Sequence, residues 1–171
     1  MNKSDSIVES EKSKNEKISL LFLDYSFGMR PAEYTNLSND LKENGKIAPS
    51  VKNPLKEVFD EEYSYQYLEN DFEGLVINNT KVYYSGHFVD GRLHMFTIVL
   101  KVNNVEQLES LQDDIVQALE GKYDTIFVPQ EIPGMNDSIE TGFLGYTRVM
   151  VASDTKEKTI SITYMYLSRF D

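Results

Sequence analysis

Two histidines, His87 and His94, flank a tight-turn signal in YYSGHFVDGRLHMF (residues 83–96), and the chain has no others. Imidazole binds metal ions and changes its charge near neutral pH, so this pair could hold a metal or transfer protons. Two imidazoles supply only half of a tetrahedral ligand set. A metal-dependent hydrolase would therefore need further ligands, and the competing interpretation is a solvated cross-strand pair in a hairpin.

The dipeptide Asp90-Gly91 is typical of a two-residue type I′ turn, which fixes the pairing of the strands beside it. In that register His87 faces His94, and Arg92 shares their face, where its charge opposes a bound cation. We therefore treat His87, Arg92 and His94 as candidate binding residues and expect no metal centre. The opposite, more apolar face is the predicted core face and carries Val82, Tyr84, Phe88, Leu93, Met95 and Val99.

A tyrosine-rich segment offers a second candidate site. Tyr63, Tyr65 and Tyr67 alternate along YSYQYLE (residues 63–69), so they share one face of an expected strand. Aromatic stripes of this kind can stack against bases or sugars. The acidic run at residues 60–62 repels phosphates, and a half-buried sheet face is the alternative interpretation.

Three acids, Glu131, Asp137 and Glu140, lie in a loop expected over residues 130–143. Paired carboxylates can hydrolyse glycosides or bind calcium, although this spacing matches no calcium-binding loop. The hydrolase interpretation would combine these acids with the two histidines, whereas a solvated contact loop is the simpler alternative. The chain has no phosphate-binding glycine loop, no nucleophile elbow and no HExxH zinc motif.

Composition excludes several classes of function. The chain has 171 residues, no cysteine and a formal net charge of −11. Without cysteine there is no disulfide, zinc–thiolate or iron–sulfur site, and we expect no cofactor. The acidic charge disfavours nucleic acid, whose phosphates need Lys and Arg, and it favours a protein partner with a basic surface. No window is apolar enough to span a membrane.

The first 17 residues are predicted to form a flexible polar tail, followed by a single α+β domain over residues 18–171. The tail lacks the apolar stretch of a signal peptide. The sequence as it stands therefore predicts a cytoplasmic protein. A periplasmic or cell-envelope location is expected instead if the initial methionine replaces a removed signal peptide.

Two amphipathic helices are expected. The first spans about residues 31–44, because Pro31 suits the first helical position and Gly45 suits the position after the last. The second runs from an Asn104 cap to Gly121. Its predicted buried stripe consists of Leu108, Leu111, Ile115 and Leu119, flanked by Val105 and Val116.

Segments of β-forming residues predict the strands. They are 63–69, 74–89 (one strand, or two split near Asn78-Asn79), 92–102, 125–129, 145–153 and 158–167. Residues 46–60 are expected to be irregular. The order is α-βββ-α-βββ, a pseudo-repeat of elements. We predict an antiparallel sheet of about six strands with both helices packed on one face.

Four segments resemble a group of small uncharacterised proteins of Bacteroidetes-type bacteria: FLDYSFGMRPAEY, GHFVDGRLHMFTIVLK, a helix ending LEGKYD, and ISITYMYL. Those proteins are similar to the helix-on-sheet fold of β-lactamase inhibitory protein and of small outer-membrane-assembly lipoproteins. The resemblance covers roughly residues 20–168. It implies a protein-binding or envelope-associated role, often behind a signal peptide.

These observations favour a non-enzymatic module that binds another protein, such as an inhibitor, an immunity-type protein or an envelope scaffold. The alternative is a metal-dependent hydrolase that uses His87, His94 and the loop acids. The candidate binding residues are Tyr63, Tyr65, Tyr67, His87, Arg92 and His94.

Overall fold

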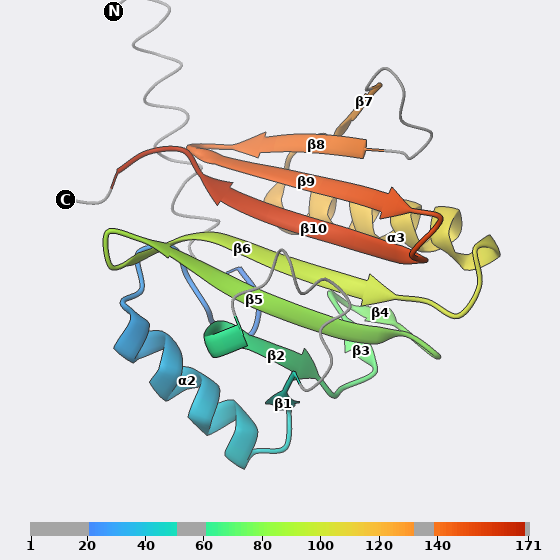
Figure 1. Cartoon of the computed structure of the whole chain (residues 1–171). Helices are drawn as coiled ribbons and strands as arrows, with labels where there is room; N and C mark the ends of the chain where they lie inside the picture. Colours follow the sequence, from blue (N-terminus) through green and yellow to red (C-terminus); the bar gives the residue numbers. More distant parts are fainter. Residues whose placement is uncertain (1–20, 51–60, 132–138, 170–171) are drawn as a thin grey trace, which may run out of the picture.

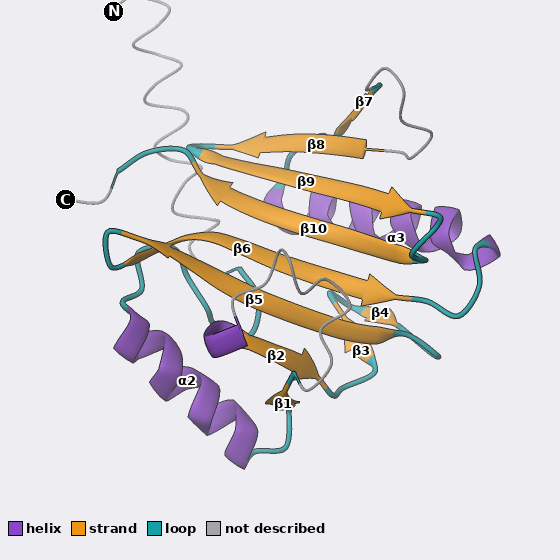
Figure 2. Ribbon diagram, in the orientation of Figure 1, coloured by secondary structure: helices purple, strands orange, loops and turns teal. Residues whose placement is uncertain are grey.

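The computed structural model describes residues 21–50, 61–131 and 139–169. It is an α+β fold with a large antiparallel sheet (Figures 1 and 2). Its elements are α2 (Pro31–Glu43), β1 (Ile47–Pro49), the 3₁₀ helix η1 (Glu61–Tyr63), β2 (Ser64–Tyr67), β3 (Asp71–Phe72), β4 (Leu75–Val76), β5 (Lys81–Val89), β6 (Arg92–Lys101), α3 (Glu106–Tyr123), β7 (Val128–Gln130), β8 (Ile139–Leu144), β9 (Thr147–Asp154) and β10 (Thr159–Tyr166). The predicted tail lies outside these residues.

The main sheet has eight strands, in the order β1-β2-β5-β6-β10-β9-β8-β7. Each half of the chain contributes one helix and then four strands of this sheet, and the last strands of the two halves, β6 and β10, pair at its centre. The predicted pseudo-repeat is therefore present at the level of elements, with four strands a half where three were expected. The short hairpin β3–β4 is inserted in the first half and forms a separate sheet.

Two of these strands lie in segments that were expected to be irregular. β1 lies within residues 46–60, and β8 occupies the end of the predicted loop over residues 130–143. β1 is only three residues long and ends at Pro49. It is too short to show the alternation of a strand, and proline is unusual within a sheet. In β8, Gly142 interrupts the run of β-forming residues; a side chain there would meet the Phe127 ring at 3.2 Å.

Both helices pack on the same face of the sheet, as predicted. Gly86 of β5, Phe96 of β6 and Tyr164 of β10 are directly opposed across the strands, so they share one face. Tyr34 of α2 lies against Gly86, and the ring of Tyr123 in α3 packs edge-on against Tyr164. In the view of Figure 1, α3 lies behind the sheet.

The ends of α2 follow the sequence signals. The backbone N–H of Arg30 donates to Oε1 of Glu33 at 3.4 Å, with Pro31 in the first turn. After the helix, Gly45 has a φ of +72°, and the N–H of Lys46 donates to the carbonyl of Leu41. This is the left-handed glycine termination expected for a helix C-terminus.

The prediction for α3 is right at its beginning and wrong at its end. The Asn104 side chain accepts the N–H of Gln107 at 3.1 Å. The helix continues past Gly121 to Tyr123, and Asp124, with a φ of +52°, takes the left-handed position. Burial explains the extension, because Tyr123 is 1% exposed.

The buried side of α3 also differs in detail from the predicted stripe. Leu108, Ile115, Val116 and Leu119 are buried, whereas Leu111 is only partly buried and Val105 is exposed. Gln112 is buried instead, and its side-chain Nε2 donates to the carbonyl of Val151 at 3.5 Å. This polar residue faces the sheet because it has a backbone acceptor there.

Buried tyrosines hold the first half together. The hydroxyl of Tyr25 lies 2.8 Å from the hydroxyls of both Tyr84 and Ser38, and Ser38 donates to the carbonyl of Tyr34 at 2.7 Å. The rings of Tyr25 and Tyr84 also pack against Phe96. The apolar rings are thus buried with their polar ends satisfied, which attaches α2 and the segment before it to the sheet.

The β3–β4 hairpin is attached to α3 by an ion pair. Nζ of Lys122 lies 3.0 Å from Oε1 of Glu73, which sits in the hairpin turn, and also donates to the carbonyl of Leu21 at 3.1 Å. Beyond the hairpin, the N–H of Ile77 donates to the carbonyl of Asn70 at 2.8 Å. These contacts fix where the chain re-enters the sheet at β5.

The β5–β6 hairpin has the predicted turn but not the predicted register throughout. Asp90 and Gly91 have φ values of +52° and +74°, as a type I′ turn requires. Phe88 pairs with Leu93 as expected, but His87 pairs with Met95, so His94 is the extra residue of a β-bulge. In β6 after the bulge, each side chain points to the face opposite the one predicted. Met95 and Val99 therefore leave the predicted core face, and Phe96 joins it.

Candidate functional site

The two histidines lie on opposite faces of the sheet. His87 follows Gly86, which faces Tyr34 and the helices, so His87 points to the other face. The ring of His94 packs edge-on against Tyr166, which shares the helix-bearing face with Tyr164. The predicted cross-strand histidine pair is therefore wrong, and the bulge is the physical reason.

Arg92 and the loop acids do not complete a site around either histidine. Nη1 of Arg92 donates to the carbonyl of Gly28 at 2.9 Å, which ties the hairpin to the segment before α2. The pKa of Glu140 is raised by burial and then by the charges of Asp113 and Glu120, so this acid lies near α3. Glu131 is exposed, and Asp137 lies outside the described residues.

No metal centre is formed by the residues that the structure describes. Among residues 21–50, 61–131 and 139–169, no three His, Cys, Asp or Glu side chains gather closely enough to hold a metal ion. The same ranges contain no helix that is both long and apolar enough to cross a membrane.

Two of the three tyrosines of the second candidate site, Tyr65 and Tyr67, belong to the core, and the third, Tyr63, packs against it. Tyr65 and Tyr67 are 8% and 7% exposed, and the Tyr63 ring packs against Phe88 and Tyr34. Burial, followed by the neighbouring Asp71, raises the pKa of Tyr67 to about 12. This agrees with the alternative interpretation of the segment, a half-buried sheet face. The tyrosine rings are therefore not exposed as a surface on which bases or sugars could stack.

A row of side chains crosses the face opposite the helices, on which the described part of the chain has no helix. Phe143 of β8 is paired with Arg148 of β9, Arg148 with Met165 of β10, Met165 with Met95 of β6, and Met95 with His87 of β5. Directly opposed residues point to the same side, so these five form a continuous row across five strands. We call it the sheet-face row. Phe143 is 55% exposed.

The neighbouring rows on this face carry no charged side chain in the middle of the sheet. They consist of Thr141, Met150, Thr163, Thr97 and Ser85, and of Ile139, Ala152, Ser161, Val99 and Tyr83. Lys81, Lys101 and Asp154 lie at the far ends of their strands. In contrast, the exposed side of α3 carries Glu106, Glu109, Asp113 and Asp114.

Arg148 is unusual within the sheet-face row. Its Nε is buried, yet it has no hydrogen-bond acceptor in the part of the chain that is described. A buried donor without an acceptor costs free energy, about 1–3 kcal/mol and more for a charged group. The sequence did not point to this residue, because only the register of β8, β9 and β10 brings Arg148 between Phe143 and Met165.

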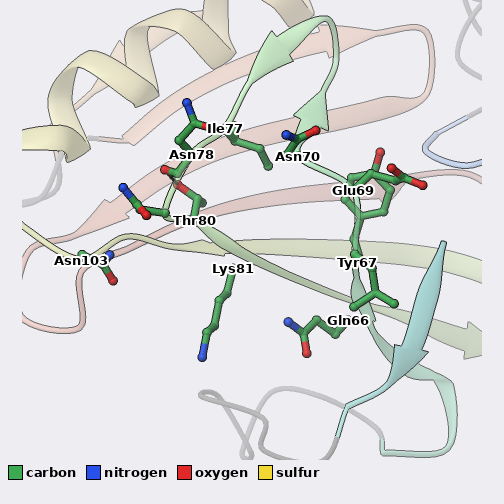
Figure 3. Close-up of a pocket in the computed structure, with 11 residues that line it drawn as sticks. Gln66, Tyr67, Glu69, Asn70, Ile77, Asn78, Thr80, Lys81 and Asn103 are labelled. Carbon is green, nitrogen blue, oxygen red and sulfur yellow. Dashed lines mark hydrogen bonds between the residues drawn. The ribbon is translucent and has the colours of Figure 1, made fainter. Parts of the chain in front are cut away.

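A pocket of about 430 Å³ opens where β2 ends and β5 begins (Figure 3). Five of its eleven lining residues carry a side-chain amide; the lining consists of Gln66, Tyr67, Leu68, Glu69, Asn70, Ile77, Asn78, Asn79, Thr80, Lys81 and Asn103. A second pocket of about 460 Å³ is lined by Val76, Ile77, Asn78, Thr80, Asn104, Glu106, Gln107, Ser110, Leu111 and Asp114. We call the first the amide pocket.

Comparison with known proteins gives no assignment. No protein-family model matches this chain, and no curated protein or solved structure matches it significantly. The resemblance to the Bacteroidetes-type proteins therefore stays a prediction.

Proposed function

We propose that this protein is a non-enzymatic module that binds a partner protein around the exposed Phe143, on the face of its sheet opposite the helices. The sheet-face row is the observation that carries the proposal. It brings Phe143, Arg148, Met165 and Met95 into one line across the sheet. Phe, Arg and Met are enriched at protein interfaces, and methionine adapts its shape to different partners.

The charges on this face favour a partner that presents a carboxylate opposite Arg148. The net charge of −11 alone favoured a basic partner. The acids of α3, however, lie in the helical layer, whereas the sheet-face row carries a cation whose Nε has no acceptor among the described residues. A carboxylate would satisfy that donor with a charge-assisted hydrogen bond.

The hydrolase alternative has no supporting observation. It required His87 and His94 to act together with loop acids. The bulge separates the two rings onto opposite faces, and Glu140 is near α3. A binding role needs no such convergence, because a flat surface of suitable composition is enough.

The proposal is tested by capturing partners from extracts of the host with the immobilised protein. The immobilised Phe143→Ser and Arg148→Ala variants should each fail to capture a specific protein that the unsubstituted chain captures. Each substitution removes one side chain of the sheet-face row. Ile126→Ser is the matched control, since Ile126 is 76% exposed and lies outside the row.

Equal capture by the row variants and the control would contradict the proposal. Melting curves of all three variants establish that each is folded. Sedimentation of the parent shows whether the partner is a second copy of the same chain. In that case Phe143→Ser should convert a dimer to a monomer, and Ile126→Ser should not.

A further inference from the structure

We propose that the amide pocket and the second pocket form one cleft that binds an uncharged saccharide. Both pockets are lined by Ile77, Asn78 and Thr80, so they lie on either side of the same short segment between β4 and β5. The cleft thus extends from the end of β2 to the N-terminal half of α3. This inference is independent of the proposed protein-binding face.

Side-chain amides give the cleft its chemistry. Five of the chain's twelve asparagines line it, together with Gln66 and Gln107. Each amide offers two donors and an acceptor, which matches the mixed donor and acceptor capacity of sugar hydroxyls. In Figure 3 the side chains of Asn78, Asn103 and Asn70 are among those that frame the amide pocket.

Most of these amides are available to a ligand. Asn104 is engaged, because its Oδ1 caps α3. The side-chain amides of Gln66, Asn70, Asn78 and Asn103 make no hydrogen bond within the described ranges of the chain. A ligand would therefore displace water from them without breaking a protein contact.

The charges around the cleft favour a neutral ligand. In the amide pocket Glu69 and Lys81 carry opposite charges. In the second pocket Glu106 and Asp114 are both acidic and would repel phosphate or carboxylate groups. Exposed Leu68 provides an apolar surface for the C–H face of a sugar ring.

The wall shared by the two pockets is held in place by the backbone. Asn79 has a φ of +57°, a left-handed conformation that asparagine tolerates better than most residues. The hydroxyl of Thr80 donates to the carbonyl of Asn78 at 3.1 Å, and the N–H of Ile77 donates to Asn70. A wall fixed in this way lowers the entropy that binding would cost.

The test is an NMR titration of ¹⁵N-labelled protein that follows the side-chain NH₂ signals of Asn and Gln. The probes are maltose, cellobiose and N,N′-diacetylchitobiose, with glucose 6-phosphate as the anionic control. We expect at least one neutral disaccharide to shift the signals of Asn78 and Asn103, with a Kd of about a millimolar. Asn103→Ala should weaken that binding at least about tenfold, which is 1.4 kcal/mol, whereas Asn39→Ala, on the exposed side of α2, should not change it.

Three outcomes would overturn the inference. One is the absence of shifts with every disaccharide at roughly 50 mM, well above the millimolar Kd expected for a shallow site. Another is stronger binding of glucose 6-phosphate than of the neutral sugars. The third is an affinity that Asn103→Ala and Asn39→Ala leave equally unchanged. None of these results bears on protein capture by the sheet-face row.

Discussion

Replacing Gly86 with alanine should destabilise the fold, because the helix α2 lies directly against the backbone of β5 there. A Cβ at this position would lie 2.6 Å from Cε2 of Tyr34 and 3.0 Å from Cδ1 of Leu93. The Tyr34 ring has little freedom to move. It is fully buried, its hydroxyl donates to the carbonyl of Tyr63 at 2.8 Å, and the Phe88 ring packs edge-on against it.

The size of the effect follows from two opposing terms. Forcing one methyl group into a packed core costs about 1–3 kcal/mol. Removing the backbone freedom of glycine from the unfolded chain returns about 0.5–1 kcal/mol. We therefore expect a net loss of about 1–2 kcal/mol, which lowers the Tm of a chain of this size by about 2–8 °C.

Urea denaturation of paired variants checks this prediction. Gly121→Ala is the matched control, because Gly121 lies inside α3 and a Cβ there meets nothing within 4 Å. It should stabilise the protein by up to about 1 kcal/mol. In a Tyr34→Leu background, which removes the ring, Gly86→Ala should cost clearly less. A Gly86→Ala protein as stable as the parent, or an equal cost in both backgrounds, would refute the packing argument.

Three further predictions concern the turn, the second helix and the buried tyrosines. Gly91→Val should cost about 1–3 kcal/mol in urea denaturation, because Gly91 has a φ of +74°, and Gly91→Asn should cost less since asparagine tolerates that region. Ile115→Ala should cost about 2–5 kcal/mol, whereas Leu111→Ala should cost less because Leu111 is only partly buried; equal losses would contradict the observed orientation of α3. Burial raises the pKa of Tyr25 to about 12, although its hydrogen bonds to Ser38 and Tyr84 act in the opposite direction. The unfolded chain loses this proton near pH 10 and the folded protein near pH 12, so stability should fall between these values. Tyr25→Phe should reduce that fall by up to about 3 kcal/mol, and an unchanged pH slope would contradict the assignment.

Local signals in the sequence predicted most of the elements. Pro31 and Gly45 bound α2, Asn104 caps α3, and Asp90-Gly91 forms the expected turn. Each of these residues acts through its own backbone preference, so its neighbours in sequence are sufficient to recognise it.

The errors arose where packing between distant segments decides the structure. Leu93 and Phe96 are fully buried on the same, helix-bearing face of the sheet, yet they are three positions apart in sequence. A regular alternation would place them on opposite faces. The bulge at His94 resolves that conflict, and it also moves His94 away from His87. Tyr123 extends α3 past Gly121 for a similar reason, because its ring is buried against Tyr164.

The candidate sites could not be predicted from neighbouring residues in the sequence. A break near Asn78-Asn79 was one of two alternatives for residues 74–89, but the amide pocket also needs Gln66 and Asn103, which come from other parts of the chain. Nothing in the sequence around Arg148 identifies it as a candidate binding residue. Whether its Nε has an acceptor depends on residues that are close in space but distant in sequence.

The pairing of β6 with β10 at the centre of the sheet has a consequence for how the protein is made. β6 is complete at Lys101 and pairs with β5 on one side. Its partner on the other side, β10, is the last of the described strands and is finished only at Tyr166. During synthesis β6 is therefore an unprotected edge with the apolar residues Ile98, Val99 and Leu100, a surface prone to pair with other chains. A ribosome that stalls or terminates before residue 159 would release a half-sheet with that edge exposed. Such a fragment would need chaperones, because its exposed edge strand can pair with other chains.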